Sequence, residues 1–139
     1  MLLCDTGPLV APGLSRDPDH RACVDLFTGM HLAGRPMLVP APVVAEVGYL
    51  LHARGSTRAE SAFLRSMAAG DFRTVELIAQ DFARMADLVD AYADLPLGTT
   101  DAAVIALAER LRLTDVATLD HRHFTVVRVQ HAEALTLLP

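Results

Sequence analysis

The sequence predicts an α/β fold in which helices surround a mostly parallel central sheet. Short apolar segments alternate along the chain with longer segments whose apolar residues recur at helical spacing. The apolar segments are continuous runs, which is typical of strands that are buried on both faces of a parallel sheet. No repeat, low-complexity tract or linker interrupts this pattern, so we expect a single domain over residues 1–139.

Five segments have the composition of short buried strands. The first is Met-Leu-Leu-Cys at residues 1–4, which the polar and turn-forming residues from Asp5 to Pro8 bring to an end. The strand at 116–119 likewise ends at Asp120. The predicted strands cover residues 1–4, 37–39, 72–75, 116–119 and 125–129.

Helical spacing connects these strands. Gly55 and Ser56 separate two of the helices, because glycine ends a helix readily and serine caps the start of the next. Pro12 and Gly13 predict only a short or broken helix before residue 14. The predicted helices cover residues 18–32, 41–54, 57–69, 81–93 and 99–113.

The helix over 81–93 has the clearest apolar and polar faces. We expect its apolar face to meet the core and its charged face to meet solvent. The inward set is Phe82, Met85, Val89 and Tyr92, and the outward set is Arg84, Asp87 and Asp90.

Composition excludes several classes of protein. Hydrophobic residues make up 52% of the chain and charged residues 21%, which argues against intrinsic disorder. A protein that holds nucleic acid mainly by neutralising phosphates is expected to be basic, whereas the net charge of this chain is −5. A bound divalent cation or a local group of arginines would have to offset the repulsion. All 12 basic residues are arginine, so a Walker-type phosphate loop and a Schiff-base mechanism, which need lysine, are excluded.

The sequence also predicts a cytoplasmic protein. No apolar run approaches the roughly 18–20 residues that cross a bilayer, and the N-terminus lacks the basic start of a secretory signal. Cys4 and Cys23 lie in apolar surroundings, so we expect them to be small core residues outside any disulfide or zinc site.

Two aspartates stand out because each directly follows a predicted buried strand. In open α/β sheets, ligands bind beyond the carboxyl ends of the strands, where Asp5 and Asp120 would lie. The simpler alternative is that each residue forms a turn or caps a helix, as aspartate often does. Taken singly, either residue fits that alternative slightly better.

Two further acids complete a candidate set. The helical neighbours of Glu46 at three and four positions away are largely apolar and include no basic residue, so its carboxylate either loses hydration or meets a cation. The simpler alternative is that Glu46 lies at the rim of the buried stripe and reaches water or a distant arginine. Asp101 lies in the first turn of the helix over 99–113, where the helix dipole alone would explain a negative charge. The argument for a site therefore depends on all four acids together.

Their combined chemistry indicates a divalent metal site. Carboxylate oxygens are the ligands that Mg²⁺ prefers, and several carboxylates cannot stay ionised side by side without a cation. A bound Mg²⁺ could orient an attacking water and stabilise the negative charge that develops on a phosphodiester. Such an ion would also offset the electrostatic repulsion between this acidic protein and a polyanionic substrate.

Four segments resemble the motifs of PIN-domain proteins, in particular the VapC-type toxins of bacterial toxin–antitoxin pairs. MLLCDTGPLV resembles the strand that ends in the first acid, and PAPVVAEVGYLL resembles the helix that carries the glutamate. YADLPLGTTDAAVIALAERL and VATLDHRHFTVVR resemble the segments that hold the third and fourth acids. The resemblance extends over nearly the whole chain, and its last two motifs are fairly specific.

This resemblance implies a three-layer α/β/α fold and an endoribonuclease that depends on Mg²⁺, or on Mn²⁺ in its place. It also implies a homodimer, an RNA substrate and a cognate VapB-type antitoxin that blocks the acidic pocket. The metal and catalytic residues that it implies are Asp5, Glu46, Asp101 and Asp120. Asp5 and Asp101 are the first candidates for direct ligands, and Glu46 would bind the metal or hold an attacking water.

Several residues near these acids have weaker cases. Thr6 and Arg122 are candidates for substrate contacts, the latter because a guanidinium matches phosphate oxygens. Asp94 continues a polar helical stripe, and we leave it outside the set. His121 and His123 could suggest zinc, but without cysteine we expect them to be surface or phosphate-facing residues.

Other function classes fit less well. An Asp-nucleophile phosphohydrolase needs a second aspartate two residues after the first, where Gly7 stands, and it also needs a lysine. A signalling receiver domain fails on the same residues. A catalytically silent PIN-like module that only binds other proteins remains as the alternative to the nuclease.

Overall fold

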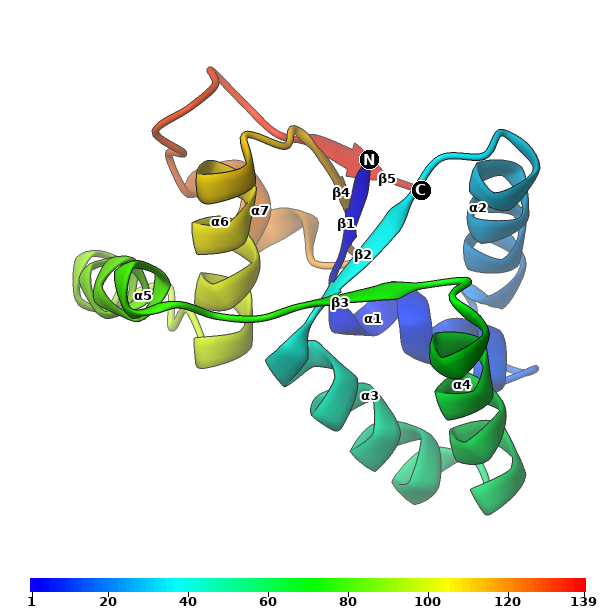
Figure 1. The fold of residues 1–139 in the computed structure, drawn as a ribbon. Helices are drawn as coiled ribbons and strands as arrows, with labels where there is room; N and C mark the ends of the chain where they lie inside the picture. Colours follow the sequence, from blue (N-terminus) through cyan, green and yellow to red (C-terminus); the bar gives the residue numbers. More distant parts are fainter.

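A computed structural model describes residues 1–139, and its centre is a five-stranded sheet in the order β3-β2-β1-β4-β5. Every neighbouring pair of strands is parallel, which confirms the predicted fold class. Helices α1–α4 lie on one side of the sheet and α5–α7 on the other (Figure 1), so the architecture has three layers. The strands are β1 Leu2–Cys4, β2 Met37–Pro40, β3 Arg73–Val75, β4 Asp115–Ala117 and β5 Thr136–Leu138.

Helices fill the connections between the strands. The first helical segment is a short α-helix followed directly by a 3₁₀ helix that contains Pro12, in agreement with the short or broken helix predicted there. The helices are α1 Thr6–Val10, the 3₁₀ helix η1 Ala11–Gly13, α2 His20–Leu32, α3 Ala41–Arg54, α4 Thr57–Ala69, α5 Ala79–Ala91, α6 Thr99–Leu111 and α7 His121–Val126. None of them combines the length and the apolar character that crossing a bilayer requires.

Strand β1 lies in the middle of the sheet, and its three residues are fully buried. The chain passes from β1 to β2 and β3 on one side, and it later returns to β4 and β5 on the other. The carboxyl end of β1 is therefore the point where the strand order reverses, which is where open α/β sheets bind ligands. Cys4 is paired with Ala117, so Asp5 and Thr118 are the first residues beyond this pair on neighbouring strands.

Helix α6 is fixed in place by burial on all sides. Its residues from Ala102 to Ala108 are each at most 2% exposed, as expected for a helix with neighbours all around it. It contacts β1, β2 and α5. Because the packed part begins directly after Asp101, the position of that carboxylate is set by the core of the protein.

The face that α5 buries differs from the prediction. Met85 is buried as expected, but Phe82 and Val89 are 56% and 39% exposed, so their predicted inward orientation is wrong. The buried side of α5 also carries charges: Asp81 pairs with Arg110 of α6, and Arg84 pairs with Glu109. These ion pairs share the buried side of α5 with Met85 and Leu88, and Arg84, predicted to face solvent, is half-buried.

The end of the chain also differs from the prediction. The segment over 125–129, predicted as a strand from its β-branched residues, instead overlaps the end of α7, and the last strand is β5. Asp120 caps α7 by accepting a hydrogen bond from the backbone of His123, and Phe124 anchors the helix in the core at 2% exposure. A good cap and one buried aromatic side chain thus outweigh the strand propensity of Thr125 and Val126.

Both cysteines behave as predicted. Cys4 and Cys23 are fully buried, and neither forms a disulfide. Each fills space in the core as a small apolar residue does.

Candidate active site

Asp5 lies at the carboxyl end of β1 and is only 6% exposed. Its side chain makes no capping hydrogen bond to α1, so the capping alternative does not explain this residue. Instead, its Oδ2 accepts a hydrogen bond of 2.8 Å from the hydroxyl of Thr118. Burial raises the pKa of Asp5 to about 6; the backbone of Thr6 and the hydroxyl of Thr118 lower it, whereas the charges of Asp101 and Glu46 raise it further.

Thr118 connects the first and fourth acids, a role that the sequence analysis missed. Its fully buried hydroxyl donates to Asp5 and accepts a hydrogen bond of 3.0 Å from the backbone N–H of Asp120. It can do both because β1 and β4 are neighbours and Thr118 directly follows the last residue of β4. Sequence alone offers one signal, a single hydroxyl within the apolar run that leads to Asp120.

Glu46 is brought to Asp5 by the short connection from β2 to α3. Its Oε2 accepts a hydrogen bond of 2.8 Å from the hydroxyl of Thr6, which follows Asp5 in the chain. Glu46 is exposed, so the argument that it loses hydration among apolar neighbours is wrong. What favours a role in the site is its fixed position beside Asp5. Thr6 is buried and holds this carboxylate, and its contact with substrate stays a prediction.

Asp101 enters from the opposite layer, in the first turn of α6. Burial raises its pKa; the amide of Gly98 lowers it, the charges of Asp120 and Glu46 raise it, and His123 lowers it. Two of the four acids, Asp5 and Asp101, therefore hold their protons more tightly than usual. Asp5 is buried and Asp101 is half-buried, each near further carboxylates, and shifted pKa values of this kind are common at functional sites.

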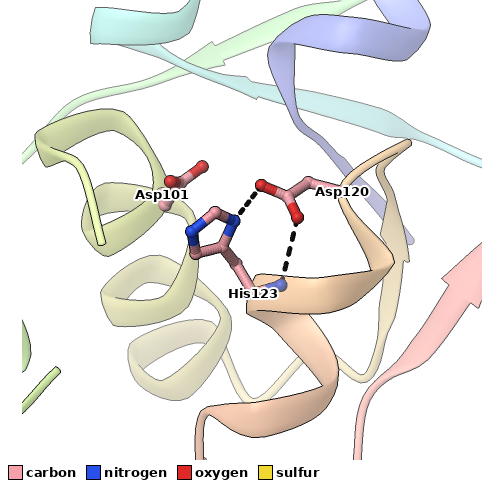
Figure 2. A group of neighbouring side chains, drawn as sticks. All are labelled: Asp101, Asp120 and His123. Atoms are coloured by element: carbon pink, nitrogen blue, oxygen red, sulfur yellow. Dashed lines mark hydrogen bonds and ion pairs between the residues drawn. The ribbon is translucent and has the colours of Figure 1, made fainter. Parts of the chain in front are cut away.

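Asp120 has two roles at the start of α7. Its Oδ1 caps the helix by accepting a hydrogen bond of 3.0 Å from the backbone N–H of His123, so the capping interpretation is correct. Its Oδ2 is hydrogen-bonded to Nδ1 of the same histidine (Figure 2). Asp101, Asp120 and His123 each offer one atom, and these three atoms all lie within 4.8 Å of one another.

His123 therefore lies beside two of the candidate acids and is half-buried, so its assignment to the exposed surface is wrong, and the alternative that it faces a substrate phosphate stays a prediction. Its Nε2 is hydrogen-bonded to the backbone carbonyl of Leu95 at 2.9 Å. Desolvation lowers its pKa, but the hydrogen bond to Asp120 and the other contacts outweigh this effect, so the pKa is raised. The signal in the sequence is its spacing of three residues after a helix-capping aspartate. His121, Arg122 and Asp94 are exposed or half-buried and make none of these contacts; a phosphate contact by Arg122 stays a prediction.

The donors fit a divalent cation. Four carboxylates from the ends of β1 and β4 and from helices α3 and α6 lie near enough for their charges to act on one another. Only Asp101, Asp120 and His123 offer atoms close enough together for one ion as the structure stands, and Asp5 and Glu46 are outside that group. Hard cations favour such oxygen-rich sets. Burial is the largest cause of the raised pKa values of Asp5 and Asp101, and a cation would offset the smaller part that neighbouring carboxylates add.

Comparison with known proteins places this geometry in a family. A family model described as the PIN domain matches residues 2–129. The chain belongs to the PIN-domain family. This PIN domain is 34% identical to ribonuclease VapC26 of Mycobacterium tuberculosis over 142 residues, covering 99% of the chain and 100% of the relative. The resemblance noted from the sequence, to the VapC-type ribonucleases, is thus confirmed.

Solved structures agree on the fold. VapC20 of Mycobacterium tuberculosis, described as a Sarcin-Ricin loop cleaving toxin, has a TM-score of 0.79 at 18% identity, covering 96% of this chain and 99% of its own. VapBC2 of Rickettsia felis, solved with a promoter DNA fragment, has a TM-score of 0.68 at 13% identity, covering 99% and 98%. FitAcB of Neisseria gonorrhoeae has a TM-score of 0.67 at 20% identity, covering 100% and 97%. At these identities the likeness shows a shared fold.

Proposed function

We propose that this PIN domain, a VapC-type ribonuclease, hydrolyses RNA phosphodiester bonds with Mg²⁺, or with Mn²⁺ in its place, held by Asp5, Glu46, Asp101 and Asp120. One observation supports this most directly. The pKa values of Asp5 and Asp101 are both raised, first by burial and then by the charges of neighbouring acids. These two carboxylates come from opposite sides of the site. A protein that gathers negative charge in this way, with no lysine in the chain, needs a cation to act on a polyanion.

Each residue has a distinct task in this proposal. Asp5, whose carboxylate accepts a hydrogen bond from Thr118, and Asp101 would hold the ion directly, and Asp120, which lies close to Asp101, would complete the site. Glu46, which accepts a hydrogen bond from the hydroxyl of Thr6, would orient the attacking water by accepting a hydrogen bond from it. Arg122 contacts a substrate phosphate. The ion, when bound, stabilises the negative charge that develops on the phosphate.

Metal removal tests this function. With Mg²⁺ present, we expect the purified protein to cleave at least one RNA in a panel of transfer, ribosomal and messenger RNA. Cleavage should stop in EDTA and return when Mg²⁺ or Mn²⁺ is added in excess, because the transition-state charge is then again stabilised. Cleavage that persists in EDTA would refute the metal mechanism. If no RNA is cleaved by a folded, metal-loaded protein, the silent binding module becomes the better interpretation.

We further propose that the protein is the toxin of a type II toxin–antitoxin pair and that it acts in the cytoplasm. The structural relatives include VapBC2, FitAcB and a toxin–antitoxin complex of Klebsiella pneumoniae with a TM-score of 0.62. The proposal includes a homodimer, as the family resemblance implies. A VapB-type antitoxin would then bind this toxin and block its acidic site.

Co-expression tests the partner. Expression of the chain alone should arrest growth, and expression together with the small reading frame that neighbours its gene should restore it. The two proteins should elute together in size-exclusion chromatography, because an antitoxin that blocks the site has to stay bound. Growth arrest that no neighbouring frame relieves would count against a paired antitoxin, while leaving the nuclease itself to the metal-removal experiment.

A further inference from the structure

His123 is placed to do more than support its neighbour. It lies in the first turn of α7, three residues after Asp120, and its ring points into the space between Asp120 and Asp101 (Figure 2). One atom from each of these three residues lies within 4.8 Å of the other two. Ligands that share an ion at about 2.1 Å are at most about 4.2 Å apart, so shifts below one ångström bring the three together around a metal.

The two ring nitrogens of His123 have different partners, and only Nδ1 faces the acids. The carbonyl of Leu95 can only accept a hydrogen bond, so Nε2 of His123 carries a hydrogen and donates it over 2.9 Å. Nδ1 is hydrogen-bonded to Oδ2 of Asp120, so it would exchange this hydrogen bond for a bond to the ion, with Asp120 as a neighbouring ligand. Histidines that bind metals commonly donate their other N–H to a backbone carbonyl in this way, which fixes the ring and makes the free nitrogen a better ligand.

We propose that His123 is a metal ligand, through Nδ1, and that it shifts the preference of this site from Mg²⁺ toward first-row transition ions such as Mn²⁺. The proposal rests on the proposed function, since it concerns the same ion. Carboxylate sites suit Mg²⁺ and Mn²⁺ alike, whereas an imidazole adds a nitrogen donor that first-row transition ions bind more readily than Mg²⁺ does. The nitrogen therefore distinguishes this donor set from one built only of oxygen.

A simpler role would be that His123 only positions Asp120. The two roles predict different results, because a positioning residue has no bond to the ion. Direct detection of a nitrogen on the metal separates them. His121 provides a matched control, since it lies two residues away on the same helix and is exposed.

The experiment uses the full chain loaded with Mn²⁺ and examined by pulsed electron paramagnetic resonance. Wild type should show the ¹⁴N modulation of a directly bound imidazole. His123→Asn should lose this modulation, and His121→Asn should keep it. In titrations of the same proteins, His123→Asn should weaken Mn²⁺ binding by about 10–100-fold and Mg²⁺ binding by less than about threefold, because Mg²⁺ gains little from nitrogen. Circular dichroism checks that each variant is folded.

Each outcome decides between the proposals. Bound Mn²⁺ without ¹⁴N modulation in wild type, or equal loss of Mn²⁺ and Mg²⁺ affinity in His123→Asn, overturns the ligand role of His123. In that case, loss of metal binding in Asp101→Asn would still support the proposed function. If neither ion binds wild type and Asp101→Asn behaves identically, the proposed metal site itself fails.

Discussion

Replacing Asp101 with asparagine is expected to lower the RNA-cleavage rate of the Mg²⁺-loaded protein by about 10³-fold. A metal ion stabilises the transition state by several kcal/mol, and about 4 kcal/mol corresponds to this factor. Asp101 is one of the three residues whose atoms lie within 4.8 Å of one another and could share the ion. Asparagine keeps the size of the side chain and an oxygen for the amide of Gly98, so the helix start should remain intact.

The measurement is kcat/KM on the RNA that wild type cleaves best, together with thermal unfolding of both proteins. Asp90→Asn is a matched control, because it makes the same change at an exposed position of α5. We expect the control to match wild type in both measurements. A variant at Asp101 that folds normally and cleaves within tenfold of wild type would remove this residue from the site.

Much of the central fold could be predicted because its strands are marked by local sequence. The runs before Asp5 and Asp120 and the run at 37–39 are short, apolar and bounded by turn residues, and each corresponds to a strand in the structure. The parallel arrangement follows from their alternation with helices. These signals depend only on neighbouring residues, so a single sequence carries them.

The errors arise where distant residues decide the local structure. The buried side of α5 includes charged residues that pair with Glu109 and Arg110 on another helix. Residues 125 and 126 have strand propensity, but the cap at Asp120 and the burial of Phe124 make this segment helical. Neither competing interaction is visible in the local pattern.

The same contrast between local and long-range signals applies to the residues of the candidate site. Asp5 and Asp120 could be selected because they follow strands, and the family resemblance supported the choice of Glu46 and Asp101. Thr118 could not be selected, because its role depends on the register between β1 and β4. His123 was missed because only the capped first turn of α7 directs its ring toward the acids.

Replacing Asp5 with asparagine is expected to stabilise the metal-free protein at neutral pH while weakening its metal binding. The pKa of Asp5 is about 6 in the folded protein, against a reference value of 3.8. The folded state therefore holds a proton that the unfolded state releases between these values, so stability falls as the pH rises from about 4 to above 6. The difference corresponds to about 3 kcal/mol, which asparagine, being uncharged, does not incur.

Chemical unfolding at several pH values measures this effect. In EDTA at pH 7.5, Asp5→Asn should be more stable than wild type by about 1–3 kcal/mol, and near pH 3.5 the two should have nearly equal free energies of unfolding. Adding Mg²⁺ at pH 7.5 should stabilise wild type more than the variant, because ligand that binds only the folded state stabilises it by mass action. A stability difference that does not change with pH would contradict the buried, charge-crowded environment of Asp5. That environment is what a metal ion would relieve, so the same residue links the stability of this PIN domain to its proposed chemistry.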